Sequence, residues 1–346
     1  MTIQSQHKHS KSLKNLLLFL VTGLLIFSSV LLGCNRHIGV TEISGVKATT
    51  IRIAYSLSGD IVGNLIKKQG ILEKRLAPLG VSVEWKKFAA GPEFLEALKV
   101  GSVDFGVASE TSSIFAQASG APLVYVANIP ATDGASSAIL IPKDSQIQKL
   151  ADLKGKKIAF QKGSAANYFL VRALEEAGLK YSDIQPVNLT PPEARAAFLR
   201  QDVDAWVIWD PHYALAQKTL NVRVLRNAKN LSTQGSFYVA PRTFAIKNPG
   251  IIQPILEEIQ KKSDWVNANP HKVAELVSSE YGIDAAIIEI AARRRHYTLK
   301  IINEQIIKEQ QRIADLFYQL GILQKKIDVS LGMLSLQEYT ALAPKQ

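Results

Sequence analysis

Residues 197–210 read AFLRQDVDAWVIWD, the end of a helix, a short turn and a strand that is almost wholly apolar. Residues 97–109, ALKVGSVDFGVAS, have the same order, and Val103-Asp104 stands where Val203-Asp204 stands in the other stretch. Strands that alternate with helices at this spacing are typical of an α/β sheet with crossover helices. The repetition predicts two similar α/β units within one chain.

The two units extend outward from these stretches. The first begins with the alternating strand TIRIAYS at 50–56, and the second begins with SSAILIPK at 136–143. Beyond residue 250 the pattern is largely helical and amphipathic, which favours helices packed onto a lobe. We expect an α/β fold of two lobes around a cleft, with 49–132 as the first part of lobe 1, 133–240 as lobe 2, and 241–346 as the return to lobe 1 with C-terminal helices.

The N-terminus has the features of an export signal. Lys8, Lys11 and Lys14 precede a run of apolar residues at 16–33, which ends in LLGC. A basic flank, an apolar run and a small residue before the cysteine favour a signal peptide at 1–33, although the run is also long enough for an uncleaved membrane anchor. LLGC resembles the lipobox of bacterial lipoproteins, which implies cleavage before Cys34 and lipidation of its sulfur. The polar stretch 34–48 is then a tether.

Composition narrows the possible chemistry of the body. Cys34 is the only cysteine, so disulfides, thiolate metal sites and a cysteine nucleophile are excluded from the folded part. The net charge is +11, but the one dense basic run, ARRRHYTLK at 292–300, is interpreted as a solvated helix end, and no nucleic-acid partner is expected. Phosphate-binding, dinucleotide-binding and hydrolase motifs are absent, and His212 beside Asp210 is interpreted as structural. We expect no catalytic residue, no metal and no cofactor.

The candidate binding residues lie where predicted strands end. In AFQKGSAANYF, residues 159–169, a strand runs directly into a helix through small residues. Ser164 could be a plain N-cap, or the loop could present helix amides to an anion. Because ligands of α/β lobes bind at the carboxyl ends of strands, the cleft is predicted there. Trp209 is favoured over Trp206 as its aromatic contact, since the two face opposite sides of a strand. The predicted ligand-binding residues are Ser58, Gly59, Ser109, Glu110, Thr111, Gly163, Ser164, Ala165, Trp209 and Asp210.

Four stretches, residues 69–109, 114–128, 152–189 and 194–212, resemble the aliphatic-sulfonate substrate-binding proteins of ABC importers. The resemblance implies a type II periplasmic-binding protein fold, two lobes joined by two crossing strands, and capture of alkanesulfonates for a membrane permease. Two departures bear on the ligand. The family usually has TGDAPPIFAQAAG where this chain has ASETSSIFAQASG, so Glu110 stands at a position that should face the ligand, where its carboxylate would repel a sulfonate. The loop QKGSA at 161–165 has Ala165 where the family's NKGSN has an asparagine.

These observations together predict a substrate-binding lipoprotein. Its expected partners are a small organosulfonate, an ABC transporter permease and a membrane that holds its lipid anchor, and we expect a monomer on the periplasmic side of the cell envelope. Two alternatives remain open at this point. The ligand could be taurine, nitrate or a thiamine-precursor heterocycle, or the chain could be an enzyme similar to the pyrimidine-precursor synthases of related architecture.

Overall fold

The computed structural model describes residues 47–231 and 235–343. The predicted signal peptide, Cys34 and nearly all of the predicted tether lie outside these residues. Within the described ranges, no helix combines the length and the apolar composition needed to cross a bilayer.

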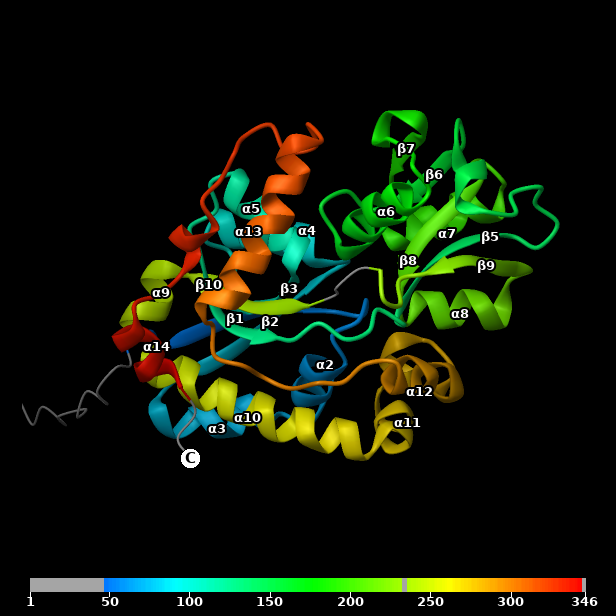
Figure 1. Ribbon diagram of the computed structural model, residues 1–346. Coiled ribbons are helices and arrows are strands. Elements are labelled where there is room, and N and C mark those ends of the chain that lie inside the picture. Colours follow the sequence, from blue (N-terminus) through cyan, green and yellow to red (C-terminus); the bar gives the residue numbers. More distant parts are fainter. Residues whose placement is uncertain (1–46, 232–234, 344–346) are drawn as a thin grey trace, which may run out of the picture. The chain divides into compact units, whose positions relative to one another are not determined.

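The described chain forms two groups of strands, which we call lobe 1 and lobe 2 (Figure 1). In lobe 1, β1 pairs in parallel with β2, while β10 lies between β3 and β4 and is antiparallel to both. A parallel bridge between Ile53 and Phe105 joins these two sheets. The strands of lobe 1 are β1 (Thr50–Ser56), β2 (Ser82–Phe88), β3 (Gly106–Ser109), β4 (Leu123–Ile129) and β10 (Ser236–Pro241).

Lobe 2 is built on a sheet whose order, within the described residues, is β7-β6-β8-β5-β9. Its core strands are buried and rich in β-branched and aromatic residues, as expected for strands covered by helices on both faces. The strands are β5 (Ser137–Pro142), β6 (Lys157–Phe160), β7 (Gln185–Asn188), β8 (Ala205–Trp209) and β9 (Val222–Asn227). The helices are α6 (Ala165–Glu176), α7 (Pro191–Leu199) and α8 (His212–Thr219).

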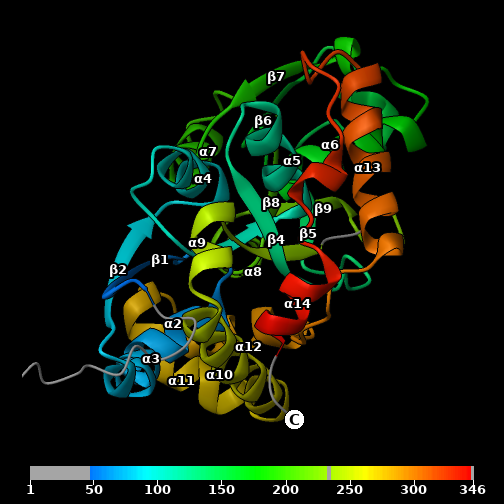
Figure 2. The same ribbon diagram turned by 90° about the vertical axis from the view of Figure 1, so that its left-hand side faces the viewer.

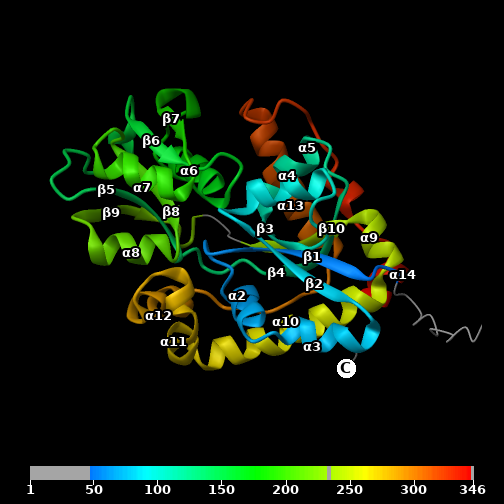
Figure 3. The ribbon, with the colours of Figure 1, turned by 180° about the vertical axis from the view of Figure 1, so that it is seen from behind.

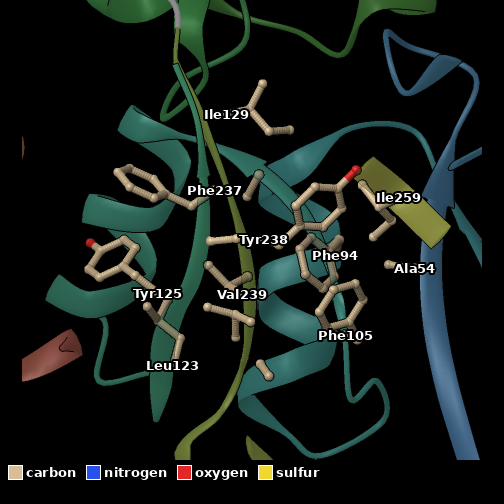
Figure 4. Packing of buried hydrophobic residues seen from close by; sticks show 14 of the residues in the cluster. Ala54, Phe94, Phe105, Leu123, Tyr125, Ile129, Phe237, Tyr238, Val239 and Ile259 are labelled. Carbon is tan, nitrogen blue, oxygen red and sulfur yellow. The ribbon is translucent and has the colours of Figure 1, made fainter. Parts of the chain in front are cut away.

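The chain passes from lobe 1 to lobe 2 between β4 and β5 and returns between β9 and β10. The return therefore comes before β10, earlier than the expected boundary at 240. Strand β10 belongs to lobe 1 because its side chains are buried on both faces of the lobe 1 sheet (Figure 4). Phe237 packs on Tyr125 with ring centroids 4.6 Å apart, and Tyr238 stacks on Phe105 at 5.4 Å.

The remaining helices cover lobe 1. Helices α2, α3 and α10 pack together along one side of its strands, and α4 packs beside α5 on the other (Figures 1 and 2). Helix α13 lies against α5, and α12 contacts α8 of lobe 2 (Figure 3). These helices are α2 (Ile61–Lys68), α3 (Ile71–Leu76), α4 (Gly91–Lys99), α5 (Glu110–Ala118), α9 (Arg242–Lys247), α10 (Pro249–Ala268), α11 (Pro270–Tyr281), α12 (Ala285–Arg293), α13 (Glu304–Gln319) and α14 (Leu336–Leu342).

Candidate functional site

A cavity of about 120 Å³ lies between the two lobes. Pockets for drug-sized ligands measure roughly 300–1,000 Å³, so this one suits a much smaller molecule. Lobe 1 and the segments joined to it contribute Ser56, Ser58, Gly59, Asp60, Ile61, Val62, Ala90, Gly91, Pro92, Val107, Ala108, Ser109, Ser112, Ile129, Gly235, Ser236, Tyr238, Ala291, Arg295 and Tyr297. The connection to lobe 2 and lobe 2 itself contribute Ser136, Ser164, Ala165, Trp209, Asp210 and Pro211.

Helices begin at the cavity from several directions. Of the described helices, α2, α4, α5 and α6 each place residues of their first turn or N-cap in its lining. The first backbone amides of a helix have no partner within the helix, and the helix dipole makes that end electropositive. Convergence of these helix starts therefore favours an anionic group in the cavity.

The loop before α6 has no side-chain N-cap. The hydroxyl of Ser164 donates to the carbonyl of Gln161 at 2.7 Å and does not accept from the helix. The amide of Gly163 donates to Asn167 Oδ1 at 3.1 Å, and Gly163 has a φ of +73°, which glycine adopts without strain. Ala165, whose methyl group blocks little, lines the cavity at the start of the helix. The plain N-cap expected as one alternative for Ser164 is therefore not formed.

Two ionisable residues of opposite charge face the cavity from lobe 1. Asp60 caps α2, where Oδ1 accepts from the amide of Gly63 at 3.0 Å. Burial raises the pKa of its carboxyl to about 6, against the lowering effects of the Gly63 amide and of Arg295. Arg295 lines the same cavity and donates from Nη2 to Ser236 Oγ at 3.1 Å. The cavity thus holds a fixed cation and a carboxyl that titrates near neutral pH.

Trp209 and His212 of lobe 2 reach Ser58 of lobe 1. The indole Nε1 of Trp209 donates to the carbonyl of Ser58 at 2.7 Å, and His212 Nε2 lies 3.1 Å from Ser58 Oγ. Gly59 has a φ of +115°, and a Cβ there would lie 3.4 Å from the carbonyl oxygen of Asp210. The small residue lets the two lobes approach closely at this edge of the cavity.

Asp210 is held by groups outside the cavity. Its Oδ1 accepts from the amide of Ala214 at 2.9 Å, and Arg294 Nη1 lies 3.2 Å from the same oxygen. Burial raises the pKa of Asp210 to about 6, and Arg294 opposes that shift. Its carboxylate is therefore already paired with a cation of lobe 1.

The structure brings seven of the predicted residues together in the lining of this cavity: Ser58, Gly59, Ser109, Ser164, Ala165, Trp209 and Asp210. It places three elsewhere. Thr111 is buried in α5, and Gly163 packs toward Phe115. The carboxylate of Glu110 lies beside Gly235. The side chain of Trp206 is buried in the core of lobe 2.

Several lining residues were not predicted. Asp60 directly follows the predicted residues Ser58 and Gly59 and has an N-cap residue type, which was a usable signal. Arg295 stands in the basic run that was interpreted as a solvated helix end. Ser136, Ser236 and Tyr297 carry no local motif, and only the packing of distant segments brings them to the cavity.

Residues 77–273 match the family model described as NMT1/THI5 like. The chain is 43% identical over 280 residues to the "Putative aliphatic sulfonates-binding protein" of Escherichia coli (strain K12), covering 81% of this chain and 86% of that protein. The chain belongs to the NMT1/THI5-like family. This finding confirms the resemblance seen in the sequence.

Two similar solved structures share the fold. The alkanesulfonate-binding protein SsuA from Xanthomonas axonopodis pv. citri, bound to MOPS, has a TM-score of 0.79 and 36% identity, covering 84% of this chain and 99% of that one. The periplasmic aliphatic sulphonate binding protein SsuA from Escherichia coli has a TM-score of 0.74 and 40% identity, covering 84% and 93%. The two α/β lobes expected from the repeat and the periplasmic-binding protein fold implied by the resemblance are both confirmed.

Proposed function

We propose that this chain is the substrate-binding protein of an ABC importer and that it captures small aliphatic sulfonates for a membrane permease. The observation that carries the proposal is the cavity itself, where helix starts from both lobes converge and Arg295 supplies a positive charge. The likeness to sulfonate-binding proteins at 36–43% identity supports the same role.

A sulfonate matches the donors that line the cavity. The group is a permanent anion with three oxygens spread over a tetrahedral face, so several N–H and O–H donors can bind it at once. Donors stand at Arg295, at the start of α6 at Ala165, and at the hydroxyls of Ser58, Ser109 and Ser236. Trp209 borders the cavity and offers apolar surface to the carbon chain. We propose these residues as ligand contacts, together with Gly59 and Ser164.

The size of the cavity bears on the length of the ligand's carbon chain. The cavity of about 120 Å³ is small beside the roughly 300–1,000 Å³ of pockets for drug-sized ligands. A short alkanesulfonate is therefore the proposed ligand class. Among the described lining residues there is no histidine, lysine or cysteine, so nothing in the cavity favours the enzyme alternative.

Isothermal titration of the body from residue 47 onward tests the ligand class. We expect short alkanesulfonates to bind, Arg295→Gln to weaken them at least tenfold, and nitrate and pyrimidine heterocycles to bind at least tenfold more weakly. Arg293→Gln is a suitable control, because Arg293 pairs with Glu289 on its own helix, with nitrogen–oxygen distances of 2.6 and 2.9 Å. Preference of the wild-type protein for nitrate or a heterocycle would contradict the sulfonate assignment.

The placement in the cell envelope is also part of the proposal. The basic flank, the apolar run and LLGC support cleavage before Cys34 and lipidation of that residue, with the folded body as a monomer outside the cytoplasmic membrane. Mass spectrometry of the membrane fraction tests this directly. We expect a lipid-modified N-terminal Cys34, whereas an intact segment 1–33 or an unmodified cysteine would contradict the anchor.

A further inference from the structure

Two carboxylates, Asp60 and Asp210, appear among the described residues that line the cavity. Asp210 is paired with Arg294, which lies 3.2 Å away and is not itself part of the lining. Asp60 and Arg295 then remain as the charges that a ligand meets. A simple sulfonate would bring a second negative charge to a site with one remaining cation.

That imbalance matters because burial already disfavours the charge of the Asp60 carboxyl and raises its pKa. Like charges interact much more strongly in a protein interior than in bulk water, and a buried charge without a partner costs several kcal/mol. Asp60 is held in place and has little freedom to move away, because it accepts from Gly63 and its own carbonyl accepts from Asn64 Nδ2 at 2.6 Å. A ligand that also carries a positive charge would restore the balance.

The surroundings of Asp60 suit such a positive group. Tyr238 and Tyr297 line the same cavity, and the hydroxyl of Tyr281, which is not part of the lining, accepts from Asn64 Nδ2 at 3.1 Å. Burial raises the pKa of all three phenols, and the negative charge of Asp60 adds to the rise. Neutral phenols beside a carboxylate offer acceptors and aromatic faces to an ammonium group.

We propose that the cavity selects sulfonates that also carry an ammonium group, the aminoalkanesulfonates, and that Asp60 is the specificity-determining residue that binds the ammonium. This inference rests on the proposed function, since it assigns the sulfonate to the helix starts and Arg295. The carboxylate that discriminates between ligand charges is thereby Asp60 rather than Glu110.

The test compares two ligands of nearly equal shape, 2-aminoethanesulfonate and propane-1-sulfonate, in which an ammonium replaces a methyl group. At pH 7.5, titration calorimetry of the wild-type protein should give at least tenfold tighter binding of the amine. Asp60→Asn keeps a side-chain acceptor for the Gly63 amide. It should lower affinity for 2-aminoethanesulfonate at least tenfold and raise affinity for propane-1-sulfonate several-fold.

Glu110→Gln is the matched control, because it removes a carboxylate that lies outside the cavity lining. It should leave the ratio of the two affinities unchanged. Equal effects of Asp60→Asn on both ligands, or a wild-type preference for propane-1-sulfonate, would overturn the inference while leaving the proposed function intact. If the wild-type protein bound neither sulfonate, the proposed function itself would fail.

A second measurement does not depend on the folding of a variant. Propane-1-sulfonate should bind the wild-type protein with uptake of a proton near pH 6.5, because its charge makes ionised Asp60 less stable. The amine should bind without proton uptake. The dependence of the binding enthalpy on buffer ionisation enthalpy measures this, and equal proton uptake with both ligands would contradict the role of Asp60.

Discussion

Arg294 joins the lobes through Asp210: the guanidinium follows α12 of lobe 1, and its Nη1 lies 3.2 Å from a carboxylate at the end of β8 in lobe 2. The same side chain donates from Nη2 to Gln217 at 2.7 Å and lies over the ring of Tyr213 at 4.3 Å. One arginine of lobe 1 thus holds three side chains of lobe 2. The described conformation is therefore one in which the lobes are in contact around the cavity.

Arg294→Ala should weaken ligand binding by about 2 kcal/mol, roughly 30-fold in dissociation constant, because closure would leave Asp210 buried without its cation. Titration calorimetry measures the affinity, and small-angle scattering should show less compaction at equal ligand saturation. Arg293→Ala, on the same helix end but paired within lobe 1, should have no such effect. Equal affinities for the two variants would show that the contact between α12 and α8 does not contribute to binding.

Trp209→Phe should weaken binding about fivefold, because it keeps an aromatic ring but loses a hydrogen bond worth about 1 kcal/mol to the Ser58 carbonyl. Trp206→Phe is the control. Trp206 is buried in lobe 2 and packs on Phe198, so its replacement should lower the melting temperature and leave affinity unchanged. If Trp206→Phe weakened binding more than Trp209→Phe, the assignment of the two tryptophans would be reversed.

Gly163→Ala should reduce both stability and affinity. A residue with a side chain at this φ of +73° costs about 1 kcal/mol, and a Cβ would lie 3.3 Å from Phe115 Cγ in α5 of lobe 1. Gly155→Ala is a matched control, with a φ of +75° and open space where its Cβ would stand. Thermal unfolding should show a similar decrease in melting temperature for both variants. We expect weaker binding in titration calorimetry for Gly163→Ala alone, and unchanged affinity would mean that Phe115 shifts freely.

His212 should make the protein less stable in acid. Burial lowers its pKa to about 4, with Arg195 adding to the shift, so the unfolded chain takes up a proton near pH 6.5 before the folded protein does. The contribution of His212 to the free energy of unfolding, up to about 3 kcal/mol, is present at pH 7 and is lost as the pH falls toward 4.

The comparison with His212→Gln isolates this effect, because the raised pKa values of Asp60 and Asp210 act in the opposite direction over the same range. Urea unfolding at pH 7, 6, 5 and 4 should show the advantage of the wild-type protein over the variant shrinking as the pH falls. Parallel stability curves would mean that His212 titrates alike in the folded and unfolded states.

The fold could be predicted because its signal is local and occurs twice. Val103-Asp104 and Val203-Asp204 mark the same turn into a strand in each lobe, where Asp104 pairs with Arg52 and Asp204 accepts from the amide of Lys157. The crossing points were harder to place. The strand SFYVAP is largely apolar, as are β5 and β8 of lobe 2, and only its pairing with β3 and β4 assigns it to lobe 1.

The site was only partly predictable, since charge in a sequence does not say where a side chain points. ARRRHYTLK reads as a solvated helix end, yet three consecutive arginines have three different surroundings. Arg293 is exposed and pairs along its helix, Arg294 crosses to lobe 2, and Arg295 lines the cavity. Successive residues turn by about 100° around a helix, so neighbours at its end face different partners.

Because Arg294 and Arg295 share a peptide bond, the group that meets the ligand and the group that crosses between lobes move on one piece of backbone. A displacement that withdraws one from the cavity also pulls the other from Asp210 and Tyr213. The residue that lines the cavity is thereby the chain neighbour of the residue that joins the end of α12 to Gln217 of α8.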